Sequence, residues 1–258
     1  MSETKSRGRF VWHDLMTTNP VQAVEFYSKV IGWGTAEWQG PVPYTMWTNN
    51  TVPIGGIMQL PKDADAPPHW LAYISSPDVD ATVKQAVNLG AKTLVAPQDI
   101  PSVGRFAVLH DPQGASFAVF TRAPRSQGAE AAPAPGEFSW HELATHDQPA
   151  AFRFYEALFG WHKTSAMDMG EMGVYQMYGR HDTPLGGMYN RPAQMPGPPA
   201  WLHYVMVDDV PRAVEATKAN GGQIVNGPLE VPGGDWIATG TDPQGAMFAV
   251  HAKKKGSE

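Results

Sequence analysis

Apolar and polar residues alternate along residues 10–17, FVWHDLMT, with the period of two that is typical of a strand with one buried face. Asn19 and Pro20 then predict the start of a helix, because Asn caps helices and proline suits their first turn. Apolar residues recur at helical spacing up to a stop at Gly32, namely Val21, Val24, Tyr27 and Ile31. Three short strands are predicted to follow, at residues 35–38, 44–48 and 54–59.

The same order of elements starts again further along the chain. A strand is predicted at residues 70–74, and a helix capped by Asp78 is predicted to run to Gly90. Three more strands are predicted near residues 93–96, 105–109 and 116–121. Residues 10–121 therefore predict two modules, and each has one strand, one helix and three further strands.

The whole pattern is then repeated. FVWHDL at residues 10–15 returns as FSWHEL at residues 138–143, an offset of 128 residues. Later motifs, such as DPQGA at residues 111–115, return at an offset of 131. A repeat of this length is a domain rather than a solenoid unit of roughly 20–50 residues. We therefore predict two α+β domains, at residues 9–122 and 137–252, joined by an Ala/Pro/Gly linker at residues 123–136.

Composition limits the classes of partner. The chain has 258 residues and a net charge of −6. It has no cysteine, and this excludes disulfides, thiolate metal ligands and a cysteine nucleophile. No stretch before the C-terminal tail concentrates Lys or Arg, which argues against a nucleic-acid partner. The N-terminus is polar, and no apolar run approaches the roughly 18 residues of a membrane span. We predict a cytoplasmic protein with a small-molecule ligand and no nucleic-acid or membrane partner.

The order of motifs resembles one superfamily. Each copy has an Asx residue with a proline one or two positions later at the helix start, Phe-Tyr near the helix end, Gly-Trp after it, and an Asp-Pro-x-Gly turn before the last strand. This order resembles the vicinal oxygen chelate superfamily, which includes glyoxalase I, bleomycin-resistance proteins, fosfomycin-resistance enzymes and extradiol dioxygenases. The resemblance implies that each domain folds two βαβββ modules into one cupped mixed sheet. It also implies a divalent metal at the floor of the cup, held by residues of the first and last strands of the modules.

The metal-ligand positions implied by the resemblance carry side chains without suitable donors. They fall on Trp12, Trp70 and Ala118 in the first copy and on Trp140, Trp201 and Ala249 in the second. Indole and methyl groups do not coordinate divalent metals. We therefore predict no metal at the usual positions and two tryptophan-lined cups that bind a small hydrophobic or aromatic molecule. The alternative is that the tryptophans fill the cups as core.

Alternation along the first strand separates its side chains into two faces. Trp12 and Asp14 share one face, and His13 lies on the other. Asp14, and Glu142 in the second copy, are therefore the candidate catalytic residues, because a carboxylate on a concave apolar wall is suited to act as a general base. The alternative is a carboxylate paired with an arginine or capping a loop. His13 and His141 are predicted to be core histidines.

Two positions at which the copies differ suggest a displaced site. Ala72 becomes His203 in the second copy, and Phe120 becomes His251. We expect both histidines on one face, where Glu142 completes a two-histidine, one-carboxylate set for Fe, Mn, Ni or Zn. The alternative is that the two histidines bind a ligand by hydrogen bonds near the mouth of the cup.

The sequence is compatible with two functions. The first is a protein that sequesters or senses a small aromatic or hydrophobic compound. The second is a lyase, isomerase or dioxygenase. Such an enzyme would use either a metal at the displaced site in the second domain or, without a metal, acid–base catalysis by Asp14 or Glu142. Whether the chain is an enzyme is left open, and both a monomer and a homodimer are compatible with the sequence.

Overall fold

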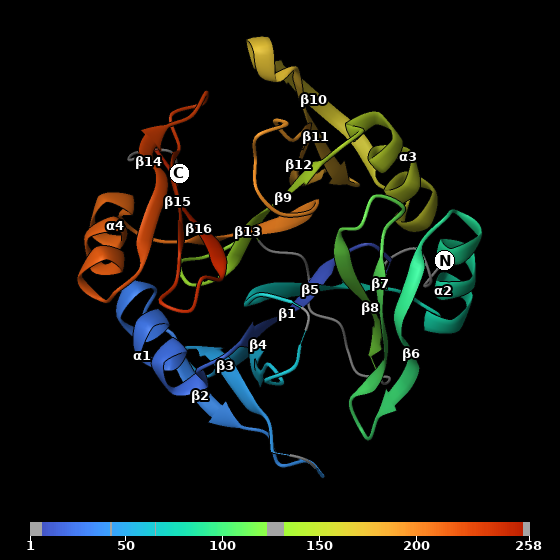
Figure 1. Cartoon of the computed structure of the whole chain (residues 1–258), viewed down its shortest axis with the longest axis horizontal. Helices are drawn as coiled ribbons and strands as arrows, with labels where there is room; N and C mark the ends of the chain where they lie inside the picture. The colour runs from blue at the N-terminus through green and yellow to red at the C-terminus, as the bar shows by residue number, and fades with distance from the viewer. Residues whose placement is uncertain (1–6, 42, 65, 123–131, 255–258) are drawn as a thin grey trace. The chain divides into compact units, whose positions relative to one another are not determined.

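The computed structural model describes residues 7–41, 43–64, 66–122 and 132–254, and its elements follow the predicted order in both copies (Figure 1). The first copy contains β1 (Phe10–Thr17), α1 (Pro20–Val30), β2 (Gly34–Glu37), β3 (Thr45–Asn49), β4 (Val52–Gln59), β5 (His69–Ser75), α2 (Val79–Asn88), β6 (Lys92–Ile100), β7 (Gly104–His110) and β8 (Ser116–Arg122). The second contains β9 (Phe138–Thr145), α3 (Gln148–Phe159), β10 (His162–Asp168), the 3-10 helix η2 (Gly170–Met172), β11 (Val174–Arg180), β12 (Thr183–Asn190), β13 (Ala200–Met206), α4 (Val210–Ala219), β14 (Gln223–Glu230), β15 (Trp236–Thr241) and β16 (Met247–Ala252).

Each copy forms one mixed sheet of eight strands. The strand orders are β2-β3-β4-β1-β5-β8-β7-β6 and β10-β11-β12-β9-β13-β16-β15-β14. Within each module the first and last strands are parallel, as in β1 with β4 and β5 with β8, because the helix carries the chain back to the same end of the sheet. The predicted α+β fold of two tandem domains, each built from two βαβββ modules, is confirmed.

All four α-helices of the described residues begin at an Asx cap. Asn19 accepts a hydrogen bond from the backbone N–H of Gln22, and Asp78 accepts one from that of Ala81, as the sequence predicted. Asp147 and Asp209 cap α3 and α4 in the same way. No helix of the described residues is long and apolar enough to cross a membrane.

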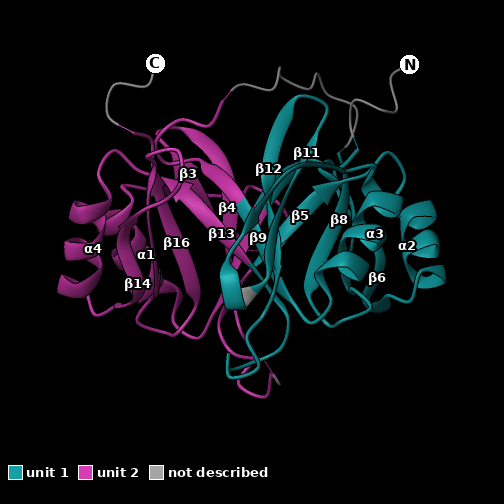
Figure 2. Ribbon diagram, turned by 90° about the horizontal axis from the view of Figure 1, so that it is seen from above, with its two compact units in different colours: residues 1–12, 71–130, 141–201 teal, residues 13–70, 131–140, 202–258 magenta. Residues whose placement is uncertain are grey.

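The compact units of the structure do not follow the two copies. Unit 1 comprises residues 1–12, 71–130 and 141–201, and unit 2 comprises residues 13–70, 131–140 and 202–258 (Figure 2). Helices α2 and α3 pack together in unit 1, and α1 and α4 pack together in unit 2. Each unit therefore contains one module of copy one and one module of copy two, whereas each sheet is formed by strands of a single copy. Residues 123–131 of the predicted linker lie outside the described residues.

In unit 2, buried hydrogen bonds explain the repeated motifs. The Tyr27 hydroxyl donates to Asp242 Oδ2 at 3.3 Å, and Trp70 Nε1–H donates to the Tyr27 hydroxyl at 3.0 Å. Asp242 Oδ1 also accepts the backbone N–H groups of Gln244 and Ala246, both at 2.9 Å, which forms the Asp-Pro-x-Gly turn. The tyrosine of one copy thus binds the turn of the other.

Unit 1 contains the reciprocal network. The Tyr155 hydroxyl donates to Asp111 Oδ2 at 3.0 Å, and Trp201 Nε1–H donates to the Tyr155 hydroxyl at 3.1 Å. Burial, followed by the charge of Asp111, raises the pKa of Tyr155 well above its ordinary value. Trp161 of the Gly-Trp motif donates to the Gly8 carbonyl at 2.8 Å. The motifs that both copies share therefore hold modules of different copies together.

Candidate functional site

A carboxylate of the first strand of copy one pairs with a tyrosine that directly precedes β3. The Tyr44 hydroxyl donates to Asp14 Oδ1 at 2.5 Å, a short distance that is typical of a phenol bonded to an ionised carboxylate. Asp14 is only 2% exposed, and it lies opposite Gly56 in the parallel ladder of β1 and β4. A Cβ atom on Gly56 would lie 1.8 Å from the Tyr44 hydroxyl and 2.7 Å from Asp14 Oδ1. Only glycine leaves room for this pair.

The second copy repeats the pair. The Tyr175 hydroxyl donates to Glu142 Oε2 at 2.9 Å, and a Cβ atom on Gly187 would lie 2.1 Å from the Tyr175 ring. Gly187 is the ladder partner of Glu142, as Gly56 is of Asp14. The second glycine of each repeated Gly-Gly therefore has the same effect, because its missing side chain leaves room for the tyrosine that bonds to the carboxylate.

A second phenol approaches the pair of copy two. Tyr189 of β12 stacks on Tyr175 with ring centroids 6.1 Å apart and an interplanar angle of 23°. Burial and then the charge of Glu142 raise the pKa of Tyr189 to about 12, so its hydroxyl stays protonated at neutral pH. The equivalent residue of copy one is Met58. The two sites thus share the pair but differ in the surrounding polarity.

Sequence analysis selected the two carboxylates and missed both tyrosines. Tyr44 and Tyr175 stand at the same offset of 131 as the repeated Gly-Gly, so a comparison of the copies contains the signal. In each copy a phenol donates a hydrogen bond to the carboxylate.

Trp12 lies beside an apolar cluster in unit 1. Leu71, Tyr73, Val108 and Ala118 form its buried centre, and Trp12, Val95, Phe106 and Phe120 are partly buried around it. Tyr73 lies opposite Ala118 in the parallel ladder of β5 and β8, so the two side chains share a face. This cluster presents several aromatic rings in unit 1.

Trp70 and Trp201 do not lie on that face, and the prediction that they line the cups is wrong. Trp70 is 8% exposed and packs in the core of unit 2 against Tyr27, Trp33 and Trp47. Trp201 packs in the same way against Tyr155 in unit 1. On β5 it is Leu71 and Tyr73 that share the face of Ala118, and a difference of one residue moves a strand side chain to the opposite face. Trp140 stays half-buried on β9, two residues before Glu142.

The displaced metal set predicted from His203, His251 and Glu142 is also wrong. In the parallel ladder of β13 and β16, Tyr204 lies opposite Ala249, and Met206 lies opposite His251. His203 therefore takes the opposite face of the sheet from His251. His251 instead contacts Ser139 and Asp235, with which its ring nitrogens form hydrogen bonds.

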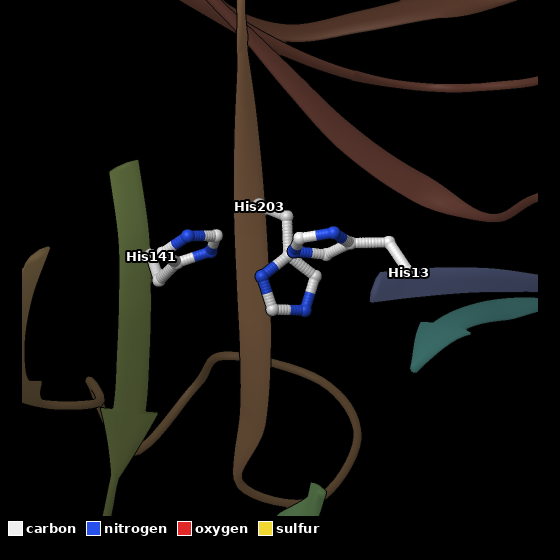
Figure 3. A group of neighbouring side chains, drawn as sticks. All are labelled: His13, His141 and His203. Carbon is white, nitrogen blue, oxygen red and sulfur yellow. The ribbon is translucent and has the colours of Figure 1, made fainter. Parts of the chain in front are cut away.

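His203 lies beside His13 instead. Their ring centroids are 5.0 Å apart at 70°, and His13 stacks on Phe138 with centroids 3.6 Å apart. One ring nitrogen from each of His13, His141 and His203 lies within 4.8 Å of the others (Figure 3). All three residues are buried, and burial lowers the pKa of His203 to about 3, so this imidazole is neutral at pH 7. The sequence predicted His13 and His141 in the core, but it did not predict that His203 lies near them.

This strand order, duplicated in one chain, defines the class of protein. The chain belongs to the glyoxalase/bleomycin resistance protein/dioxygenase superfamily. The sequence model of that superfamily matches residues 137–250, and the model of a glyoxalase-like domain matches residues 11–120. The resemblance inferred from the sequence is therefore confirmed.

Similar proteins cover nearly the whole chain. The anthracycline biosynthesis protein DauV of Streptomyces sp. strain C5 is 29% identical over 261 residues, which are 94% of this chain and 92% of that protein. The crystal structure of the Mn(II)-bound glyoxalase from Novosphingobium aromaticivorans has a TM-score of 0.63 at 16% identity and covers 97% of this chain and 83% of that one. Homoprotocatechuate 2,3-dioxygenase from Arthrobacter globiformis has a TM-score of 0.68 at 16% identity, with 96% and 80% covered. At these identities the structures show a common fold.

Proposed function

We propose that the chain binds a planar, oxygenated aromatic molecule through its two carboxylate–tyrosine pairs. The observation that carries this proposal is the duplicated pair, Asp14 with Tyr44 and Glu142 with Tyr175, each admitted by a glycine. A phenol fixed by a carboxylate keeps its oxygen lone pairs available to a ligand hydroxyl, and the carboxylate can accept a second hydrogen bond. Such a pair suits a ligand whose rings carry hydroxyl or carbonyl oxygens.

The aromatic part of the proposal is supported by the apolar cluster around Trp12 in unit 1, the unit to which Glu142 and Tyr175 also belong. Tyr73 lies 6.0 Å from Phe106 and 6.4 Å from Phe120, measured between ring centroids. Aromatic rings in this range of separations favour offset or edge contacts with a further ring. The relative DauV is named an anthracycline biosynthesis protein, and an anthracycline is a planar, oxygen-rich aromatic compound.

We propose that this binding does not use the metal of the family. The resemblance assigns ligand positions to Trp12 and Trp140 on the first strands and to Ala118 and Ala249 on the last strands. Indole and methyl groups offer no donor to a divalent cation, and Ala118 and Ala249 are fully buried. The residues present at these positions do not fit the metal, and no step of the proposed function passes through it.

Metal-independent proton transfer is a second candidate function. It is favoured by the 2.5 Å contact between the Tyr44 hydroxyl and Asp14 Oδ1, because a carboxylate that holds a phenol at this distance can accept its proton. In this function the Tyr44 oxygen takes a proton from a ligand hydroxyl while its own proton moves to Asp14, and Asp14 then returns a proton through Tyr44 to another ligand atom. A cytoplasmic location and a monomeric or homodimeric state stay predictions.

The binding proposal is tested by titrating the full chain with 1,8-dihydroxyanthraquinone, followed by calorimetry and by tryptophan fluorescence. Replacing one phenol with Tyr44→Phe or Tyr175→Phe removes a hydrogen bond, which is worth about 0.5–1.5 kcal/mol, or roughly 2- to 12-fold in Kd. The double variant is expected to bind more weakly by this factor at both sites, and a chelator is expected to leave binding unchanged. The matched control is Val87→Ala, an exposed position of α2.

Two results would contradict the proposal. One is that the wild-type chain leaves the anthraquinone unbound at millimolar concentration. The other is that the double tyrosine variant binds as tightly as the control. Turnover of the probe that disappears with Tyr44→Phe would instead favour proton transfer over simple sequestration.

A further inference from the structure

A second polar network lies wholly in unit 2, apart from the carboxylate–tyrosine pairs. Ser139 Oγ of β9 is 3.0 Å from His251 Nδ1 of β16, and His251 Nε2 is 2.9 Å from Asp235 Oδ2 in the turn before β15. The imidazole therefore joins a hydroxyl on one side to a carboxylate on the other. This is the arrangement that activates a serine hydroxyl in nucleophilic catalysis.

Copy one has none of these three side chains. The residues equivalent to Ser139, Asp235 and His251, at offsets of 128, 131 and 131, are Val11, Gly104 and Phe120. Strands β7 and β8 of copy one keep the same antiparallel pairing as β15 and β16, with Phe106 opposite Phe120 and Ile237 opposite His251. The fold is therefore formed without the network. Three positions at which the copies differ are therefore joined by hydrogen bonds in copy two.

The protonation states follow from the partners of Asp235. Burial acts to raise the pKa of Asp235, but hydrogen bonds from His251, from the Lys254 backbone N–H and from the Lys253 ammonium group hold it at about 2. An ionised carboxylate only accepts hydrogen bonds, so His251 Nε2 must carry a hydrogen. Burial lowers the pKa of His251, against the smaller opposing effect of Asp235, so the ring is neutral at pH 7. His251 Nδ1 then has a lone pair and accepts the hydroxyl hydrogen of Ser139.

We propose that Ser139 is a nucleophile for carboxylic esters, with His251 as its general base and Asp235 as the group that orients the imidazole. Ser139 is a half-buried residue, and the side chain of His251 is 11% exposed. Ser139 Oγ also lies 3.3 Å from the Tyr204 carbonyl oxygen, a weaker second acceptor. The ester activity is separate from aromatic binding and does not depend on it.

The reaction has two balanced steps. In the first, Ser139 Oγ forms a bond to the ester carbonyl carbon while its proton moves to His251 Nδ1. The bond between that carbon and the leaving oxygen then breaks, and His251 returns the proton to the leaving alcohol. In the second step, water gives a proton to His251 and attacks the acyl-serine, which releases the carboxylic acid and restores the Ser139 hydroxyl with that proton.

The test uses a fluorophosphonate probe and p-nitrophenyl acetate with the full chain. Peptide mapping is expected to find the phosphonate on Ser139, and none in Ser139→Ala. His251→Phe, which installs the copy-one residue, is expected to slow both labelling and ester hydrolysis by about 100-fold or more, the usual contribution of a general base. Asp235→Asn is expected to slow both reactions and to change their pH profile. Ser165→Ala, at an exposed serine, is the matched control and is expected to behave as the wild type.

The pH profile separates a base from a structural contact. The rate of labelling is expected to rise with pH through a midpoint below 6.5, since burial lowers the pKa of His251. Two results would overturn the proposal. One is the absence of an adduct on Ser139 while Ser139→Ala lowers the melting temperature, which would make the network a tie between strands. The other is an adduct that forms as fast in His251→Phe as in the wild type. Neither result bears on anthraquinone binding.

Discussion

Removing the Tyr155 hydroxyl tests how the two copies are held together. In Tyr155→Phe the carboxylate of Asp111 loses a hydrogen bond of 3.0 Å, and Trp201 Nε1–H loses an acceptor at 3.1 Å. Asp111 is 3% exposed and Tyr155 is fully buried, so water does not readily replace the hydroxyl. A buried polar group left without its partner costs about 1–3 kcal/mol, so two such groups predict a loss of about 2–6 kcal/mol in the free energy of unfolding.

The loss is also expected to depend on pH. Burial raises the pKa of Asp111, and hydrogen bonds from backbone N–H groups and from Tyr155 partly offset this rise. The Tyr155 hydroxyl thus favours the ionised carboxyl, and in the variant the folded-state pKa of Asp111 rises further. The destabilisation is therefore full at pH 7 and declines as the pH falls through the raised pKa of Asp111, where the carboxyl is protonated in both proteins.

Urea unfolding at pH 7 and pH 4, followed by circular dichroism, measures both effects. The matched variant is Tyr27→Phe, which removes the equivalent hydroxyl of unit 2, where the contact with Asp242 is longer at 3.3 Å. Its destabilisation is expected to be the smaller of the two. A loss below about 1 kcal/mol for Tyr155→Phe, or one that is equal at both pH values, would refute the reasoning.

Two further predictions concern single positions. Gly56→Ala is expected to displace Tyr44, because the new Cβ would lie 1.8 Å from the tyrosine hydroxyl. The variant is therefore expected to weaken anthraquinone binding as Tyr44→Phe does. Unchanged binding in calorimetry would count against a role of the pair in binding. The folded-state pKa of His203 is about 3, below the ordinary 6.5, so the wild type is expected to lose stability as the pH falls from 6.5 towards 3. His203→Ala, the copy-one residue, should flatten that slope in urea titrations, whereas exposed His162→Ala should leave it as it is.

The sequence was sufficient for local structure. Asn19 and Asp78 cap their helices as predicted, because a cap depends on atoms three residues away. Strand β6 is longer than predicted and runs to Ile100, because pairing with β7 extends it beyond its apolar residues. Pairing between distant strands is a tertiary effect that local pattern does not carry.

The site was predicted less completely, for two reasons. Side-chain faces depend on register, and an error of one residue on β5 placed Trp70 on the ligand face instead of Leu71. The partners of Asp14 and Ser139 are distant in the chain, since Tyr44 lies 30 residues and His251 lies 112 residues away. The difference between Val11 and Ser139 is visible in the repeat, but only the folded chain shows that it meets His251 and Asp235.

The most direct test of the proposed function is a crystal structure of the full chain with 1,8-dihydroxyanthraquinone. The proposal predicts a ring oxygen of the ligand within about 3.2 Å of the Tyr44 or Tyr175 hydroxyl, with no metal between ligand and protein. A ligand held at another surface, or a ligand oxygen bound to a metal at the site, would contradict it.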